Sequence, residues 1–168
     1  MRGWFVAAIL LAATPVLALY DPMPVAEIAP MEGSWRGTLV YKDYGNGQLV
    51  ELPTQLFAAL VSPETIALHY VFDDGPGKTV HSYERIRFDL AADAVEWVSE
   101  TEDGPRGVVL SSERDGDRWR LVFQTGAGEE TERYTLEVEP AALRIRKEEV
   151  GSEATPTFRN ELKFERVG

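Results

Sequence analysis

Residues 117–147, DRWRLVFQTGAGEETERYTLEVEPAALRIRK, decide the fold class because polar and apolar side chains alternate along them. In the first run, Trp119, Leu121 and Phe123 take every second position, and two further runs repeat this period after turn signals that contain Gly or Pro. A period of two predicts β-strands with one buried face and one solvated face. The turns are short, so neighbouring strands are expected to pair antiparallel.

The same pattern covers the chain from Gly33 to the C-terminus, where nine turn signals separate ten short runs. No segment between the runs is long enough for a crossover helix. Ten strands in a meander leave exposed edges unless the sheet closes on itself. The sequence therefore predicts an all-β fold, an antiparallel up-and-down meander barrel of about ten strands, with a two-sheet sandwich as the alternative.

The early strands are less regular than the later ones. Residues 49–61 and 65–72 are apolar on both faces, and the outward side carries Phe57, Val61 and Val71. Such a patch could be a homodimer surface or lie under the N-terminal arm, and a parity error across a bulge would explain it equally well. Pro53 cannot donate to a strand ladder, so we expect a bulge there.

The N-terminus has the pattern of a secretory signal peptide. Arg2 precedes an apolar run over 4–13, and Val16-Leu17-Ala18 offers small or compact residues for cleavage. A transmembrane helix needs about 20 apolar residues, which this segment does not supply, and no later segment does either. We expect a signal peptide over 1–18, an extended Pro-containing arm over 19–32 and one barrel domain over 33–168, exported to the periplasm or secreted.

Composition narrows the function classes. The chain has no cysteine, which excludes thiol catalysis, Fe–S clusters and cysteine zinc sites, and which suits a bacterial periplasmic protein better than a small animal secreted domain. The net charge of −11 argues against nucleic acid as a partner.

Gly33-Ser34-Trp35, a Gly-x-Trp motif at the start of the first strand, resembles the lipocalins and the wider calycin group. The resemblance implies that Trp35 closes the narrow end of the barrel and that an arginine of the last strand packs across it. Arg166 has the inward parity for this role, whereas Arg159 points outward. Gly33, Trp35 and Arg166 are therefore the expected closure residues.

The chain also departs from the families in this group. Lipocalins have eight strands followed by a helix, and fatty-acid-binding proteins insert a helical lid where this chain has a tight turn at 44–48. The haem-binding ten-stranded relatives need a late histidine, and none follows His81. The resemblance therefore implies a lipocalin-like barrel of an exported bacterial branch, and the ligand of any one relative is not carried over.

Glu84 is the most informative polar residue because it shares a face with Val80, Ile86 and Phe88. A carboxylate that points into an apolar barrel is costly unless it is paired, and Arg166, Asn160 or a tyrosine could be its partner. It could anchor the head group of a ligand. A structural buried pair, or a register shift that exposes the carboxylate, is the simpler explanation.

The inward parity also selects a set of wall residues, which for the last strand includes Phe158, Leu162 and Phe164. With Glu84, the predicted ligand-binding residues are Tyr41, Tyr70, Glu84, Trp97, Trp119, Phe123, Tyr134 and Asn160.

Other chemical motifs are weak. Residues 75–79, GPGKT, lack the first glycine and the following helix of a phosphate-binding loop. His69 and His81 flank this turn with outward parity, and with Asp73 or Asp74 they would make a poor metal site, so we expect surface histidines and neither metal nor cofactor.

Three function classes are consistent with these features of the sequence. The first is a binding module that holds a hydrophobic small molecule or lipid inside the barrel. The alternative is a non-enzymatic interaction or structural protein of the envelope, an adaptor or inhibitor with a filled barrel. An enzyme has the least support, because no Ser–His–Asp set or paired-carboxylate site stands out.

Overall fold

The computed structural model describes residues 28–168 except 90–91, 100–105, 127–129 and 152–154. The signal peptide and residues 19–27 of the arm lie outside the described residues. The elements are η2 (Ala29–Met31), β1 (Gly33–Lys42), β2 (Leu49–Ser62), β3 (Thr65–Asp73), β4 (Thr79–Asp89), β5 (Ala94–Ser99), β6 (Arg106–Asp115), β7 (Arg118–Thr125), β8 (Glu132–Val138), β9 (Ala142–Glu149) and β10 (Thr157–Arg166).

The ten strands form a closed barrel in which each strand pairs antiparallel with its neighbours in sequence and β10 closes on β1. This confirms the predicted all-β up-and-down barrel and excludes the sandwich. Glycines with positive φ, among them Gly47, Gly75 and Gly116, stand in the turns that the sequence marked. Within the described residues, no helix is long and apolar enough to cross a membrane.

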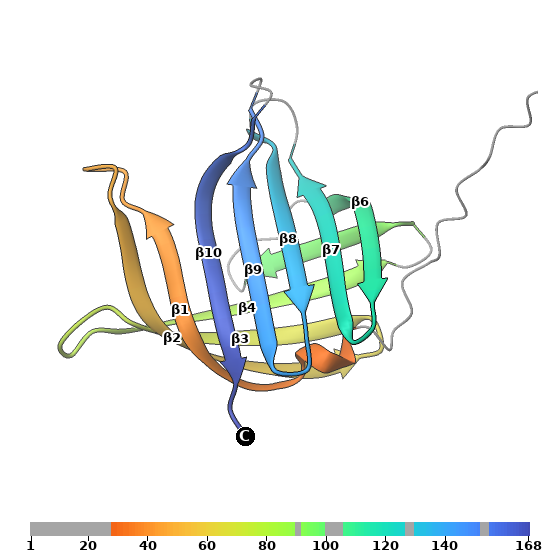
Figure 1. Ribbon diagram of the computed structural model, residues 1–168, viewed down its shortest axis with the longest axis horizontal. Helices are drawn as coiled ribbons and strands as arrows, with labels where there is room; N and C mark the ends of the chain where they lie inside the picture. The colour runs from red at the N-terminus through yellow and green to blue at the C-terminus, as the bar shows by residue number, and fades with distance from the viewer. Residues whose placement is uncertain (1–27, 90–91, 100–105, 127–129, 152–154) are drawn as a thin grey trace, which may run out of the picture.

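In Figure 1, β7–β10 cross in front of β2–β5. The β5–β6 ladder is described over three residue pairs, from Ala94 with Val108 to Glu96 with Arg106. The next residue of β5, Trp97, pairs with Ile86 of β4, and its ring contacts Phe123 and Tyr134 in the interior.

The two ends of the barrel differ. The closed end carries η2 and the turns β2–β3, β6–β7 and β8–β9, and Figure 1 shows η2 beside the last two of these turns. Ile28 and Met31 are fully buried there, so the last residues of the expected extended arm instead form a short 3₁₀ helix that plugs the barrel. The open end carries the turns β1–β2 and β3–β4, together with the ends of β7 and β9 and the starts of β8 and β10.

Two expectations about strand register are corrected. Pro53 causes no bulge: the β1–β2 register runs unbroken through Thr38 and Pro53. The β2–β3 ladder begins only at Thr54, so the missing N–H of Pro53 leaves no gap in it. Instead, β10 has an irregularity between Phe158 and Asn160, which turns Phe158 to the outer face, where Arg146 lies 5.3 Å from its ring centroid.

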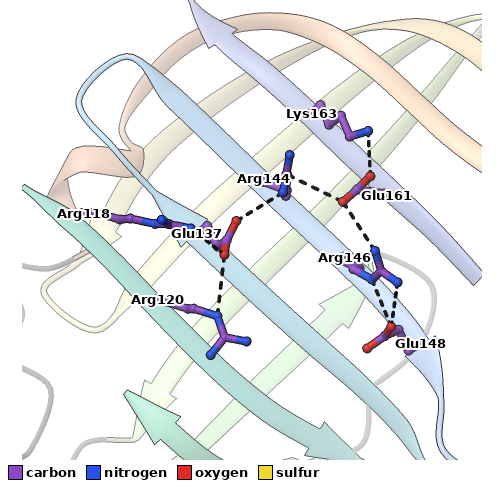
Figure 2. A network of polar contacts seen from close by, with 8 residues as sticks. All are labelled: Arg118, Arg120, Glu137, Arg144, Arg146, Glu148, Glu161 and Lys163. Atoms are coloured by element: carbon purple, nitrogen blue, oxygen red, sulfur yellow. Dashed lines mark hydrogen bonds and ion pairs between the residues drawn. The ribbon is translucent and has the colours of Figure 1, made fainter. Parts of the chain in front are cut away.

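The outer face of β7–β10 carries a network of ion pairs (Figure 2). Glu137 contacts three arginines of β7 and β9, and Glu161 contacts Arg144, Arg146 and Lys163 at 3.6, 4.0 and 2.8 Å. The side chain of Glu161 is only 10 % exposed, whereas its cationic partners are about half exposed. The network links neighbouring strands on the outer face and gives Glu137 and Glu161 three cationic partners each.

Candidate ligand-binding site

A pocket of about 400 Å³ opens at the open end of the barrel. Inward side chains of β1–β4 and β10 form its apolar wall, and charged residues stand at its rim. The lining residues are Leu39, Tyr41, Lys42, Tyr44, Leu52, Phe72, Asp74, Val80, Arg159 and Asn160. Tyr41 and Asn160 therefore lie at the mouth, and Val80 remains 49 % exposed although it faces inward.

Tyr70 lies behind this pocket on β3. Its ring stacks on Phe72, which lines the pocket, at 5.8 Å and on Phe164 at 6.4 Å. The residue is 1 % exposed, and its hydroxyl has no hydrogen-bond partner among the residues that the structure describes. Burial and then the charge of Glu84 raise the pKa of Tyr70 well above its ordinary value. A buried hydroxyl without a partner is uncommon and calls for an explanation.

Glu84 faces inward from β4, opposite Leu68 on β3. Its Oε2 accepts a hydrogen bond from Trp97 Nε1 at 2.7 Å, and its Oε1 accepts one from Ser82 Oγ at 3.2 Å. Burial raises the pKa of Glu84, and these two hydrogen bonds and the charge of Lys147 partly offset that rise. Among the described residues, neither Arg166 nor Asn160 is its hydrogen-bond partner, since its two donors are Trp97 and Ser82.

Three aromatic side chains form the wall beside Glu84. Tyr134 stacks parallel on Phe123 with ring centroids 5.0 Å apart, and Trp97 lies 5.0 Å from Tyr134 and 6.2 Å from Phe123. The Tyr134 hydroxyl donates to Glu132 at 2.9 Å. Burial, and then the charge of Glu132, raise the pKa of Tyr134. These rings give the interior flat apolar surfaces next to a carboxylate.

Lys147 and Glu132 were missed by the sequence reasoning. Lys147 Nζ pairs with Glu132 Oε1 at 2.7 Å and lies 5.3 Å from the centroid of the Tyr134 ring. Lys147 continues the inward parity of Leu143 and Ile145, and Glu132 precedes Tyr134 by two residues, so the alternation itself carried the signal.

Trp119 lies apart from the other predicted ligand-binding residues. It is buried toward the closed end, where its ring meets Phe88 edge to face at 6.2 Å and its Nε1 donates to Ser112 Oγ at 3.1 Å. Parity placed Trp119 on the inner face, but parity does not say how far along the barrel a residue lies.

Gly33, Trp35 and Arg166, the expected closure residues, lie together at the closed end of the barrel. The guanidinium of Arg166 lies 4.1 Å from the centroid of the Trp35 ring, and Trp35 Nε1 donates to the Met31 carbonyl at 2.9 Å. Arg166 also donates to the carbonyls of Pro30, Glu32 and Pro140. Gly33 has φ +131°, and a Cβ there would stand 2.5 Å from Arg166 Nη1, so both backbone and space require glycine.

The outer face of β2–β4 carries the histidine pair. His69 Nε2 and His81 Nδ1 are 2.9 Å apart, and His69 also stacks on Tyr83 at 4.2 Å. No group of three or more His, Cys, Asp or Glu that could hold a metal ion occurs among the described residues. Phe57, His69 and Tyr83 line a shallow groove of about 560 Å³ on this face.

Comparison with solved structures shows which proteins share this barrel. Rv2717c from M. tuberculosis superposes with a TM-score of 0.65 at 13 % identity, over 88 % of this chain and 100 % of that one. The S-type phycobiliprotein lyase CPES from Guillardia theta gives 0.59 at 13 % identity, over 87 % and 93 %. This likeness shows a lipocalin-like fold. No protein-family model matches the sequence, and no curated protein is significantly similar to it.

Proposed function

We propose that this protein is an exported lipocalin-like barrel that binds a hydrophobic small molecule or lipid through the open end of the barrel. The observation that carries the proposal is the buried, unpartnered hydroxyl of Tyr70 beside Glu84, directly behind an apolar pocket. A barrel built only for stability would fill this space with apolar side chains. A buried hydroxyl without a partner next to a carboxylate, behind an apolar pocket, is what a site for an amphipathic ligand provides.

The fold comparison supports the architecture of this proposal and leaves its chemistry open. The phycobiliprotein lyase shares the barrel at 13 % identity, too low for its activity to be transferred. We propose that this chain acts by binding alone. Export rests on the signal peptide expected over 1–18, and cell fractionation tests it: the processed protein should start near Leu19 and leave the cytoplasm.

Binding is tested with the chain that starts at Leu19 and with N-phenyl-1-naphthylamine, a neutral probe that fluoresces in apolar surroundings. We expect saturable binding of one probe per barrel. Val80→Trp would fill the mouth and should weaken binding at least about tenfold. Val61→Trp, on the outer face at 62 % exposure, is the matched control and should leave binding unchanged. Absence of saturable binding, or equal effects of the two variants, would refute the proposal.

The groove of Phe57, His69 and Tyr83 favours the alternative of an interaction protein, because Phe57 and Tyr83 are 45 % and 43 % exposed. Self-association is its simplest form. Sedimentation of the mature chain distinguishes the two: Phe57→Lys should dissociate a homodimer that uses this face and leave a monomeric binding barrel unchanged.

A further inference from the structure

In the open half of the barrel, Glu84 is an inward carboxylate without a countercharge in contact. Near it, Lys147 pairs with Glu132 at 2.7 Å, whereas Lys42, Asp74 and Arg159 stand at the rim of the pocket. Glu84 has only the neutral donors Trp97 and Ser82. Within the parts of the chain that the structure describes, the interior therefore holds an acidic group that has no ion pair.

The groups around Glu84 are suited to a cationic head group. Each oxygen of Glu84 accepts one hydrogen bond and keeps a further lone pair, and the nearby Tyr70 hydroxyl has no partner. Trp97 and Tyr134 add aromatic faces, which attract cations through their ring quadrupoles. A primary ammonium has three donors and can satisfy the carboxylate and the hydroxyl together.

We propose that the ligand is an amphiphile with a protonated amine head, which pairs with Glu84 and the Tyr70 hydroxyl while its apolar tail lies along the pocket at the open end. This inference rests on the proposed function and adds the chemical class of the ligand. The expected ligand is a hydrophobic organic cation, and a fatty acid is disfavoured.

An anionic head group fits these surroundings less well. The groups that interact with Glu84 are Tyr70 on β3, Ser82 on β4, Trp97 on β5, Tyr134 on β8 and Lys147 on β9. Lys147 is the one cation among them, and its Nζ is already engaged by Glu132. An anion would have to displace Glu132 or bind next to a carboxylate, and either is unfavourable in an interior of low dielectric.

The test compares three probes with the same ten-carbon chain: decylammonium, decanol and decanoate. Each displaces N-phenyl-1-naphthylamine from the mature protein, below its micelle concentration and at about 0.15 M salt, which screens exposed charges. We expect decylammonium to bind at least about tenfold tighter than decanol, and decanoate to bind weakest. The preference for the amine should grow from pH 5 to pH 8 as Glu84 ionises.

Glu84→Gln keeps the shape of the side chain and should reduce decylammonium binding to the level of decanol, with decanol itself unchanged. Tyr70→Phe should lower decylammonium binding by a smaller factor, again without affecting decanol. Glu51→Gln, an exposed outward carboxylate on β2, is the control and should preserve the preference.

The possible outcomes distinguish failure of the cationic ligand from failure of the binding function. Equal binding of decylammonium and decanol, a preference for decanoate, or an amine preference that survives in Glu84→Gln would overturn the cationic ligand and leave the binding function in place. Failure of the naphthylamine and all three decyl probes to bind would refute the proposed function and this inference with it.

Discussion

Arg166 is expected to be the side chain on which the closed end depends most. It donates three hydrogen bonds to carbonyls of Pro30, Glu32 and Pro140 and lies over Trp35. Hydrogen bonds from a charged donor at half-exposed sites contribute about 1 kcal/mol each, and the cation–π contact adds about 0.5–1 kcal/mol. Arg166→Met should therefore lower the free energy of unfolding by about 3–4 kcal/mol, which corresponds to a Tm lower by roughly 10 °C.

Urea and thermal unfolding of the mature chain, followed by circular dichroism, measure this loss. Arg159→Met is the matched control, because Arg159 also lies over one ring, that of Tyr44, at the opposite end, but pairs with a single carboxylate and does not bind three carbonyls. A single exposed pair of this kind contributes about 0.2–1 kcal/mol. Arg166→Lys should behave like Arg166→Met, because the single nitrogen of an ammonium cannot replace the three nitrogens of the planar guanidinium, each of which donates to a different carbonyl. Equal losses in Arg166→Met and Arg159→Met would refute the reasoning.

Three further predictions concern stability. Burial raises the folded-state pKa of Glu84, so the contribution of Glu84 to stability is fully present below its unfolded-state pKa and is lost as pH rises through its folded-state pKa. Glu84→Gln should therefore have the same Tm as the natural protein near pH 4 and a higher Tm at pH 8. Tyr70→Phe removes a hydroxyl without a partner and should leave Tm equal or higher, and a loss above about 1 kcal/mol would show that the hydroxyl has a partner. Glu161→Gln leaves three cations around a neutral amide and should destabilise by about 1–3 kcal/mol, less in high salt, whereas Glu165→Gln, an exposed carboxylate on the same strand, should change stability little.

The fold could be predicted because the alternation and the turn glycines are local signals. Residues 118–123 read as a strand on their own, and Gly116 and Gly126 stand where the chain has positive φ. Ten such runs without a crossover segment leave closure as the simplest solution, which the β1–β10 ladder provides. The Gly-x-Trp motif was informative for the same reason, since Gly33 is required by its own φ and by the close approach of Arg166.

What the sequence could not predict depends on contacts between distant segments. The irregularity in β10 turns Phe158 outward, and nothing in the alternation around Asn160 marks it. Ile28 and Met31 are buried because the barrel end accepts them, whereas a segment with Pro30 is by itself equally compatible with an extended arm. The placement of Trp119 toward the closed end required the stagger of the strands, which parity does not contain.

The two polar systems of the molecule differ in whether their groups are satisfied. On the outer face, Glu137 and Glu161 are each surrounded by three cations (Figure 2). At the closed end, Arg166 donates to three carbonyls. In the interior, the Tyr70 hydroxyl has no hydrogen-bond partner among the described residues, and Glu84 has two neutral donors and no cation in contact. A buried polar group without a partner lowers stability by about 1–3 kcal/mol, and Phe in place of Tyr70 would remove that loss with nearly the same shape. Arg133 Nε is the other buried atom without a partner in the described part of the chain, but only the Tyr70 hydroxyl lies next to a buried carboxylate behind the open pocket, as expected of a group that a ligand completes.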